Sequence, residues 1–447
     1  MQIAVPGDTI FALSSGAGRA GIAVVRVSGP QASAALQAIA RVMPQVRHAR
    51  VARLIDPRSG DSIDRGLVIR FAAPRSATGE DMVEFHVHGG GAVVAALLES
   101  LGGVPGLRLA EPGEFTRRAV FNGKLDLTAA EGVADLIAAE TQAQRRQALA
   151  QAEGGLRRLY EGWRERLLAA LARAEAELEF PDEDLPAGVG SAALADAGAV
   201  AREIAAHLAD GRRGERLRDG LSVAILGAPN VGKSSLLNRL AEREAAIVAP
   251  SAGTTRDVIE VALDLGGYPV VLADTAGLRP TGDAVEAEGV RRARARAEAA
   301  DLRLLLFDAA SWPELDAGTR ALADERAILV LSRADLRPEL DAPRVDGRPA
   351  LRVSALTGAG IGSLVGALTE TAASLMRPGE APVLTRARHR AALEDCRAAL
   401  VRADLAELPE LAAEDLRLAA RALGRITGRV DIEQVLDRVF RDFCIGK

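Results

Sequence analysis

The sequence predicts a multidomain α/β protein: an N-terminal α+β domain, a helical domain, and an α/β domain with a mostly parallel, doubly wound sheet inserted into the helical domain. Three observations lead to this prediction. The first third of the chain alternates as strands do, helical periodicity flanks the middle of the chain, and short apolar runs alternate with helical segments between residues 221 and 368. With 447 residues and 48% apolar content, the chain exceeds one hydrophobic core.

The N-terminal domain is predicted at residues 1–121. Its candidate strands are β-rich runs bounded by Gly and Pro at 21–27, 66–71 and 82–88. A helix is expected at about 92–101. This mixture indicates a small α+β domain.

The helical domain is predicted in two segments, 122–215 and 374–447. Thr128 is a candidate N-cap, with Glu131 placed as in a capping box. A long helical stretch should follow and end at the Pro-containing segment 181–186. Its apolar stripe comprises Leu149, Leu156, Leu159, Trp163, Leu167, Leu171 and Leu178.

Further helices are expected at 191–213 and, after a linker at 377–382, towards the C-terminus. The last helix has one apolar face, formed by Ile432, Val435, Leu436, Val439, Phe440 and Phe443. Helices on both sides of an α/β unit favour an insertion, although two separate bundles would give a similar pattern.

The inserted domain is predicted at residues 216–373. Four apolar runs, at 222–226, 270–273, 302–307 and 327–331, are spaced like parallel strands with helical crossovers. The alternation indicates a doubly wound sheet.

The charge balance indicates no general attraction to nucleic acid, because 56 basic and 61 acidic residues give a formal net charge of -5. Two distant cysteines, Cys396 and Cys444, do not form a disulfide framework. The chain begins without a secretion signal and has no apolar run of about 18 residues. We therefore expect a cytoplasmic protein without membrane contact.

Gly227 to Ser234 carries the strongest chemical signal. G-A-P-N-V-G-K-S matches the phosphate-loop pattern G-x-x-x-x-G-K-[ST], follows a strand and opens a helix. The backbone amides of such a helix N-terminus bind phosphates. Lys233 would contact the β- and γ-phosphates, and Ser234 would bind Mg²⁺. A chance Gly-rich turn is the alternative.

Later motifs favour GTP over ATP and indicate a Ras-like G domain. A Thr-Thr-Arg-Asp run at 254–257 offers Thr255 as a second Mg²⁺ ligand, and D-T-A-G at 274–277 follows a strand as a γ-phosphate sensor should. Leu278 stands where Ras-like proteins have the glutamine that positions the attacking water. The polar group must come from elsewhere, with Arg279, Asp283, Glu286 and Glu288 as candidates. A GTPase that only binds nucleotide is the alternative.

Base recognition departs from the usual pattern. S-R-A-D, from Ser332 to Asp335, stands where GTPases normally have N-K-x-D. Asp335 can accept hydrogen bonds from the guanine edge, and Arg333 can lie over the base. Ser332 is shorter than the asparagine that makes the usual contact. Ser354 and Ala355 resemble the last guanine-binding loop.

Together these motifs resemble the MnmE (TrmE) family of tRNA-modifying GTPases, in the TrmE-Era-Septin-like superfamily. The resemblance covers essentially the whole chain, including G-R-A-G-I-A-V-V-R-V-S-G at 18–29 and T-G-E-D-M-V-E-F-H-V-H-G-G at 78–90. It also includes E-P-G-E-F-T-R-R-A-V-F-N-G-K-L-D-L at 111–127 and the terminal C-I-G-K.

The resemblance implies a set of residues that bind GTP. They are Asn230, Val231, Gly232, Lys233, Ser234, Ser235, Thr254, Thr255, Asp274, Thr275, Ala276, Gly277, Ser332, Arg333, Asp335, Ser354 and Ala355. Lys233, Thr255 and the water-orienting Glu286 would act in hydrolysis, with Mg²⁺ bound by Ser234 and Thr255.

The family also uses a potassium ion in the place of an arginine finger. The matching ligands are the side chains of Asn230 and Thr254 and the carbonyls of Ala249 and Ser251. In the family, dimerisation of the G domains assembles this site, so hydrolysis should be linked to domain motion.

The N-terminal domain, by the same resemblance, dimerises and binds a tetrahydrofolate derivative, either 5-formyl or 5,10-methylene. The matching contacts are Arg26, Glu84, Lys124 and Lys447. An arginine or lysine suits a glutamate tail, and a carboxylate suits a pterin. A structural ion pair is the alternative for Arg26 and Glu84, and a metal site is the alternative for His86 and His88.

The C-I-G-K tail does not fit prenylation, because Gly446 and Lys447 break that pattern. The family matches Cys444 as a residue important for modification, acting at or near the one-carbon transfer site as a nucleophile or acid–base group. A tail without a role is the alternative.

The resemblance implies that the protein adds an aminomethyl or carboxymethylaminomethyl group at C5 of the wobble uridine, position 34, of certain tRNAs. The family works with the flavoprotein MnmG (GidA), in a heterotetramer or larger assembly, which supplies FAD and NADH. The alternative is a regulatory or ribosome-assembly GTPase without modification chemistry.

Overall fold

The fold is described from a computed structural model, which covers residues 7–179, 189–243, 246–247, 260–274, 298–377, 379, 382–430, 439–440, 443 and 446. Within these residues, none of the helices combines the length and the apolar character needed to cross a membrane. The chain divides into two compact units, described separately below. The first comprises Met1–Ala134, Gln151–Ala193 and Ala406–Lys447, and the second Asp135–Ala150 and Leu194–Leu405.

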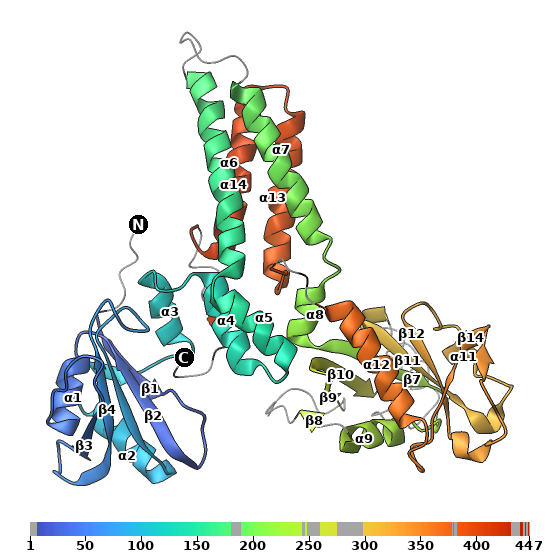
Figure 1. The fold of residues 1–447 in the computed structure, drawn as a ribbon. Helices are drawn as coiled ribbons and strands as arrows, with labels where there is room; N and C mark the ends of the chain where they lie inside the picture. The colour runs from blue at the N-terminus through green and yellow to red at the C-terminus, as the bar shows by residue number, and fades with distance from the viewer. Residues whose placement is uncertain are drawn as a thin grey trace, which may run out of the picture. The chain divides into compact units, whose positions relative to one another are not determined.

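The first unit contains, in its described part, a six-stranded sheet with the order β3-β4-β5-β2-β1-β6. Figure 1 labels strands β1 to β4 of this sheet. Its neighbouring strands are antiparallel except for β1 and β6, which are parallel. The strands are β1 (Thr9–Leu13), β2 (Ala20–Ser28), β3 (Arg50–Ile55), β4 (Ser62–Phe71), β5 (Met82–Gly89) and β6 (Leu107–Leu109).

Helices α1 (Ala32–Ala40) and α2 (Gly91–Gly102) cover one face of this sheet. Val25, Val83 and Phe85 point into the core beneath them. Because side chains alternate along a strand, Arg26 and Glu84 project from the opposite face. Phe115, from α3 (Glu114–Phe121), lies over part of that second face beside Ile10 and Ala12.

The helices after α3 correct two sequence predictions. Leu149 was expected in one continuous helix with Leu156, but a turn at 153–154 separates α5 (Gln142–Ala152) from α6 (Gly155–Glu179). That prediction was wrong because the apolar spacing continues across the turn. The later stripe residues Leu156, Trp163, Leu167 and Leu171 are buried on α6 as expected.

The N-cap prediction was also wrong. Helix α4 (Leu127–Ala138) begins before Thr128, and the Asp126 carboxylate caps it by accepting hydrogen bonds from the backbone N–H groups of Thr128 (2.8 Å) and Ala129 (3.2 Å). An aspartate can accept these orphan N–H groups as well as a threonine. Farther along the first unit, α6 packs beside α14 (Pro409–Thr427) (Figure 1).

The second unit contains, in its described part, a seven-stranded sheet with the order β15-β12-β11-β7-β10-β9-β8. The central strands β12, β11, β7 and β10 are mutually parallel, as the sequence predicted, and β9 and β8 add antiparallel pairings at one edge. The strands are β7 (Leu221–Gly227), β8 (Ala246–Ile247), β9 (Glu260–Leu265), β10 (Tyr268–Asp274), β11 (Leu302–Asp308), β12 (Ala327–Ser332) and β15 (Leu351–Arg352), with a separate hairpin of β13 (Arg344–Val345) and β14 (Arg348–Pro349).

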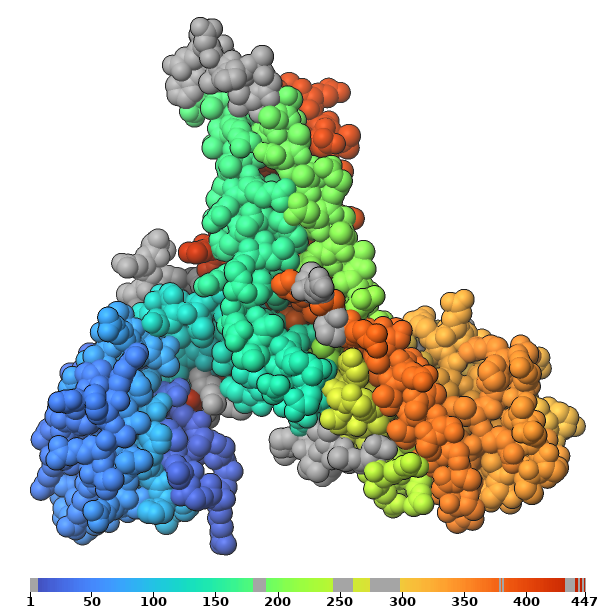
Figure 2. All heavy atoms as spheres, viewed as in Figure 1, coloured from blue at the N-terminus to red at the C-terminus, as the bar shows by residue number. Residues whose placement is uncertain are grey.

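Helices cover both faces of this sheet. Helices α9 (Lys233–Arg243) and α12 (Ile361–Met376) pack over one core, and α12 forms part of the outer surface in Figure 2. On the other face, the short helix α11 (Ala317–Arg320) packs near β11 and β7, beside a second hydrophobic core that contains Leu305 and Phe307. The doubly wound arrangement agrees with the prediction and brings the carboxyl ends of β7, β11 and β12 to one edge.

Other described helices that belong wholly or mainly to the second unit are α5, α7 (Val189–Leu208), α8 (Arg213–Asp219) and α13 (Ala387–Leu405). Asp135 accepts hydrogen bonds from Arg218 Nε (3.1 Å) and Arg386 Nη2 (2.7 Å). Arg218 precedes the first strand of the α/β sheet and Arg386 follows its last helix. One carboxylate therefore holds the two ends of the inserted segment.

Candidate nucleotide-binding site

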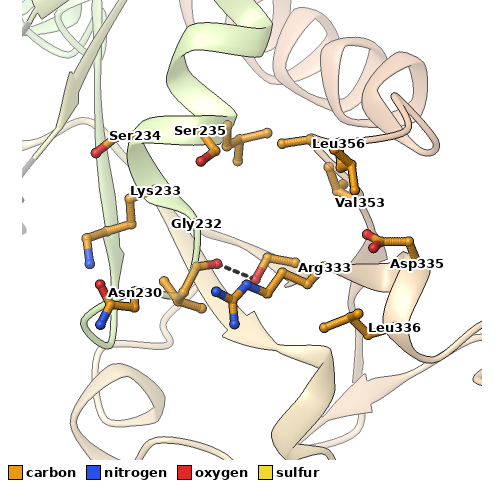
Figure 3. Close-up of a pocket in the computed structure, with 14 residues that line it drawn as sticks. Asn230, Gly232, Lys233, Ser234, Ser235, Arg333, Asp335, Leu336, Val353 and Leu356 are labelled. Carbon is orange, nitrogen blue, oxygen red and sulfur yellow. Dashed lines mark hydrogen bonds between the residues drawn. The ribbon is translucent and has the colours of Figure 1, made fainter.

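The phosphate-loop segment joins β7 directly to α9, as the sequence predicted. Gly227 lies so close to β11 that a Cβ atom there would stand 2.6 Å from the carbonyl oxygen of Leu306. Lys233 opens α9 with a buried side chain, and its ammonium donates hydrogen bonds of 2.9 Å to the carbonyls of Gly227 and Ala228. The lysine charge is thus held at the loop, beside Asn230 (Figure 3).

A cavity of about 850 Å³ connects this loop with the base-recognition segments (Figure 3). Its volume lies within the range of small-molecule sites. It is lined by Asn230, Val231, Gly232, Lys233, Ser234, Ser235, Leu236, Ser332, Arg333, Asp335, Leu336, Val353, Ala355 and Leu356. The fold therefore gathers predicted residues of the phosphate loop and of the base-recognition segments around one space.

The segment after β12 forms one end of the cavity, and Asp335 lies in this segment. Its carboxylate oxygen Oδ1 accepts a hydrogen bond from Ser354 Oγ, and Ser354 is fully buried. The Ser354 oxygen accepts a hydrogen bond from the backbone N–H of Thr357 (3.2 Å). Ser354 does not line the cavity itself. It orients Asp335 from a buried position in the protein.

Arg333 adopts a left-handed backbone conformation, with φ 55°, at the start of the segment. Its guanidinium donates a 2.9 Å hydrogen bond to Asp308 Oδ2, at the carboxyl end of β11. Sequence reasoning did not single out Asp308. The signal available in the sequence was an aspartate that directly follows the apolar run at 302–307.

Several predicted residues fall outside the described part of the chain. They are Ala249, Ser251, Thr254, Thr255, Thr275, Ala276, Gly277, Glu286, Cys444 and Lys447, together with the side chain of Asp274. The backbone of Asp274 ends β10 and pairs with Ile225 of β7. This register puts the start of the D-T-A-G motif at the same sheet edge as the phosphate loop.

The predicted folate contacts Arg26 and Glu84 lie opposite each other on β2 and β5. The Arg26 guanidinium donates to Glu84 Oε1 at 2.9 and 3.1 Å and lies 5.8 Å from the centre of the Phe115 ring. Lys124, after α3, instead donates a 3.0 Å hydrogen bond to the carbonyl of Pro74. The sheet thus joins two of the predicted contacts directly.

The described residues do not support a metal site at H-V-H. His86 Nε2 lies 3.3 Å from Glu84, whereas His88 Nδ1 lies 2.9 Å from Asp64. Within the described part of the chain, no group of three or more His, Cys, Asp and Glu side chains is placed to hold a metal ion. The two histidines pair with different carboxylates.

A buried ion cluster supports the second face of the N-terminal sheet, and sequence reasoning gave it no role. Arg118 donates hydrogen bonds to Asp8 (2.8 Å), Glu114 (3.0 Å) and Glu80 (3.3 Å), and Arg108 also contacts Asp8 and Glu114. Burial opposes ionisation of Glu114, but hydrogen bonds from Arg108, the Glu111 backbone and Arg118 outweigh it, so the pKa of Glu114 lies below its ordinary value. The E-P-G-E-F-T-R-R motif therefore places charged side chains at the start of α3, where ion pairs hold them in fixed positions.

Comparisons with known proteins agree with this architecture. The family described as "GTP-binding protein TrmE N-terminus" matches residues 9–124, and "MnmE helical domain" matches residues 127–444. The second match spans the inserted α/β unit.

The chain also resembles named proteins over nearly its full length. A "tRNA modification GTPase MnmE" from Parvibaculum lavamentivorans is 59% identical, covering 98% of this chain and 100% of that protein. One from Rhodospirillum rubrum is 57% identical, covering 98% and 99%. The human mitochondrial "5-taurinomethyluridine-[tRNA] synthase subunit GTPB3" is 50% identical, covering 99% and 94%. The chain therefore belongs to the MnmE (TrmE) family of tRNA modification GTPases.

Proposed function

We propose that this protein is a potassium-activated cytoplasmic GTPase that modifies the wobble uridine of certain tRNAs together with a flavoprotein partner. The observation that carries the nucleotide assignment is the cavity with a phosphate loop at one end and Asp335, oriented by Ser354, at the other. A carboxylate accepts hydrogen bonds from N1–H and the 2-amino group of guanine. Adenine presents an unprotonated N1 to the same carboxylate, so GTP is favoured over ATP.

An Asp335→Asn variant tests the guanine assignment. Losing two charge-assisted hydrogen bonds should weaken GTP binding about 100-fold. The asparagine amide should also improve binding of xanthosine triphosphate, whose 2-oxo group accepts a hydrogen bond. Asp341→Asn is the control, because Asp341 is exposed and does not line the cavity. Unchanged GTP affinity in the Asp335 variant, measured calorimetrically, would contradict the assignment.

The proposed hydrolysis site uses Mg²⁺ bound by Ser234 and Thr255 and a potassium ion bound by Asn230, Thr254 and the carbonyls of Ala249 and Ser251. Glu286 would orient the attacking water. The donor set is appropriate, because hydroxyl, amide and carbonyl oxygens suit such hard cations. Potassium would offset charge that develops on the phosphates, and Lys233 adds a second positive charge at the loop.

Potassium dependence is tested by comparing GTP turnover in potassium and sodium at equal ionic strength. Asn230→Gly is the informative variant, because the φ of 60° at Asn230 would strain an alanine. We expect strong potassium stimulation in the parent protein and its loss in the variant. Asn238→Ala, at an exposed position of α9, should retain the stimulation. Equal parent rates in both salts would remove potassium from the mechanism.

The N-terminal domain is proposed to bind the tetrahydrofolate derivative, 5-formyl or 5,10-methylene, in a homodimer, using Arg26, Glu84, Lys124 and Lys447. The Arg26–Glu84 pair supports this role, since it presents donors and an acceptor side by side on a partly open sheet face. Glu84→Gln should weaken 5-formyltetrahydrofolate binding about tenfold or more without changing GTP turnover. Glu99→Gln, at an exposed helix position, serves as control.

Undiminished folate affinity in Glu84→Gln would argue against this placement. Absence of folate binding by the parent protein would instead favour a regulatory or ribosome-assembly GTPase. The relatives' names support the modification role: one class is named for tRNA modification, and the human relative is named as a synthase subunit. The partner, an MnmG-type flavoprotein in a heterotetramer or larger assembly, would supply FAD and NADH.

The C-terminal tail is proposed to complete the modification site through Cys444. Phe443 and Gly446 lie on either side of this cysteine, and both contact the N-terminal domain: Phe443 packs against the cluster that contains Val120, and the Gly446 carbonyl accepts a hydrogen bond from Ser14. The other cysteine, Cys396, is unsuited to catalysis, because burial raises its thiol pKa to about 12. Cys444→Ser should abolish tRNA modification with the flavoprotein present and preserve GTP turnover. A fully modifying Cys444→Ser protein would dispose of this role.

A further inference from the structure

Ser332 occupies the position where a guanine-binding motif normally carries asparagine, and its hydroxyl faces the protein backbone. The residue ends β12 and is only 6% exposed. Its Oγ lies 2.7 Å from the carbonyl oxygen of Val231 and 3.0 Å from that of Phe307. Ser332 therefore ties the phosphate loop to the two central strands β11 and β12.

This arrangement commits the only proton that a serine hydroxyl can donate. Both neighbouring atoms are carbonyl oxygens, which accept hydrogen bonds and cannot donate them. The Ser332 oxygen therefore gives its proton to the backbone and retains only lone pairs. N7 of a purine is likewise an acceptor, so Ser332 cannot hold the loop and bind N7 at the same time.

The adjacent Arg333 is anchored to the protein by a second contact. Its Nη1 donates to Asp308 Oδ2 at 2.9 Å, which fixes the guanidinium against the end of β11. Asp335, the third polar side chain of the segment, is an acceptor. The described side chains of the base-recognition segment thus provide an acceptor, Asp335, for the Watson–Crick edge, while the hydroxyl at the asparagine position donates to the backbone instead.

We propose that Ser332 is a positioning residue for the phosphate loop, and that this protein recognises guanine through its Watson–Crick edge without a hydrogen bond to N7. The inference rests on the proposed guanine-nucleotide site. It makes this protein more tolerant of changes at N7 than a protein with asparagine at the same position. The altered residue would then act on the geometry of the phosphate loop rather than on base contact.

The test is calorimetric binding of GDP and 7-deaza-GDP, in which a C–H group replaces N7. We expect the parent protein to bind both within about twofold, since no hydrogen bond is lost. Ser332→Asn introduces an amide donor and should favour GDP over 7-deaza-GDP by about fivefold. Ser332→Ala should weaken both nucleotides by a similar factor, because Val231 loses its partner while the preference stays near one.

Ser363→Ala, at an exposed position on α12, is the control and should match the parent protein for both nucleotides. A parent preference of fivefold or more for GDP would overturn the inference while leaving the guanine site intact. Equal affinities in Ser332→Ala and the parent protein would overturn the positioning role. Failure of the parent protein to bind either nucleotide would instead reject the proposed guanine site itself.

Discussion

Ser14 Oγ donates a hydrogen bond of 2.8 Å to the carbonyl oxygen of Gly446, although the two residues are 432 positions apart. Gly446 has a φ of 94°, and a Cβ atom at this position would lie 1.9 Å from the carbonyl oxygen of Leu13. The end of β1 and the chain terminus therefore fit together only where the tail has a glycine. This contact explains why the third residue of C-I-G-K has to be a glycine, without a Cβ atom.

Gly446→Ala should release the tail from the N-terminal domain. A left-handed alanine costs about 1–2 kcal/mol, and the collision with Leu13 adds to that. We expect faster carboxypeptidase digestion of the full-length protein and loss of tRNA modification, with unchanged GTP turnover. Gly16→Ala is a matched control, since no atom lies within 4 Å of its added Cβ. Parent-like digestion of the Gly446 variant would contradict the docking.

Replacing Glu114 should destabilise the N-terminal domain and reduce its pH dependence. Because the folded-state pKa of Glu114 is depressed below its ordinary 4.5, the ionised group stabilises the fold above about pH 4.5, and that stabilisation is lost as the pH falls through the folded pKa. Glu114→Gln removes it and leaves Arg118 buried with less compensation, which should cost about 3–5 kcal/mol at pH 7.

The measurement is chemical unfolding of parent protein and Glu114→Gln between about pH 3 and 7, the range over which an acidic carboxylate titrates. The parent should lose stability towards the acid end, whereas the variant should show a flatter profile. Glu99→Gln replaces an exposed carboxylate and should follow the parent curve. Parallel curves for parent and Glu114→Gln would show that this carboxylate does not contribute the acid sensitivity.

Asp135→Asn should loosen the two ends of the inserted domain. The side chain is mostly buried, and its negative charge serves both Arg218 and Arg386. Loss of the charge should lower the free energy of unfolding by about 1–3 kcal/mol. Asp219→Asn removes an exposed partner of the same Arg218 and should change stability by less than about 0.5 kcal/mol. Equal effects in thermal unfolding would refute the bridging role.

Ser354→Ala should weaken guanine nucleotide binding without changing its specificity. Asp335 would keep its charge but lose the hydroxyl that orients it, and a hydrogen bond to a charged group contributes about 1.5 kcal/mol, or roughly tenfold in affinity. Calorimetry with GDP measures the loss. The Ser363→Ala control should bind as the parent does, and parent-like GDP affinity in the Ser354 variant would rule out the orienting role.

Local sequence patterns predicted the elements that depend on neighbouring residues. The apolar run at 222–226 became β7, which is one residue longer at each end, and the run at 302–307 became β11, which is one residue longer at its carboxyl end. The phosphate loop follows β7 and opens α9, because strand, glycine turn and helix start are all short-range features. Periodicity failed at Leu149, where an apolar spacing that fits one helix continues through a turn into the next.

The sequence by itself determined the fold class, the order of the motifs and the chemistry of the side chains around a candidate nucleotide site. Only the tertiary structure decided that the Ser332 proton faces Val231, that Asp308 holds Arg333, and that Gly446 meets Leu13. Each of these contacts joins residues from different elements, and its geometry follows from how strands pair and side chains pack. Residue spacing along the chain carries no information about the direction of a hydroxyl proton or the approach of two backbones.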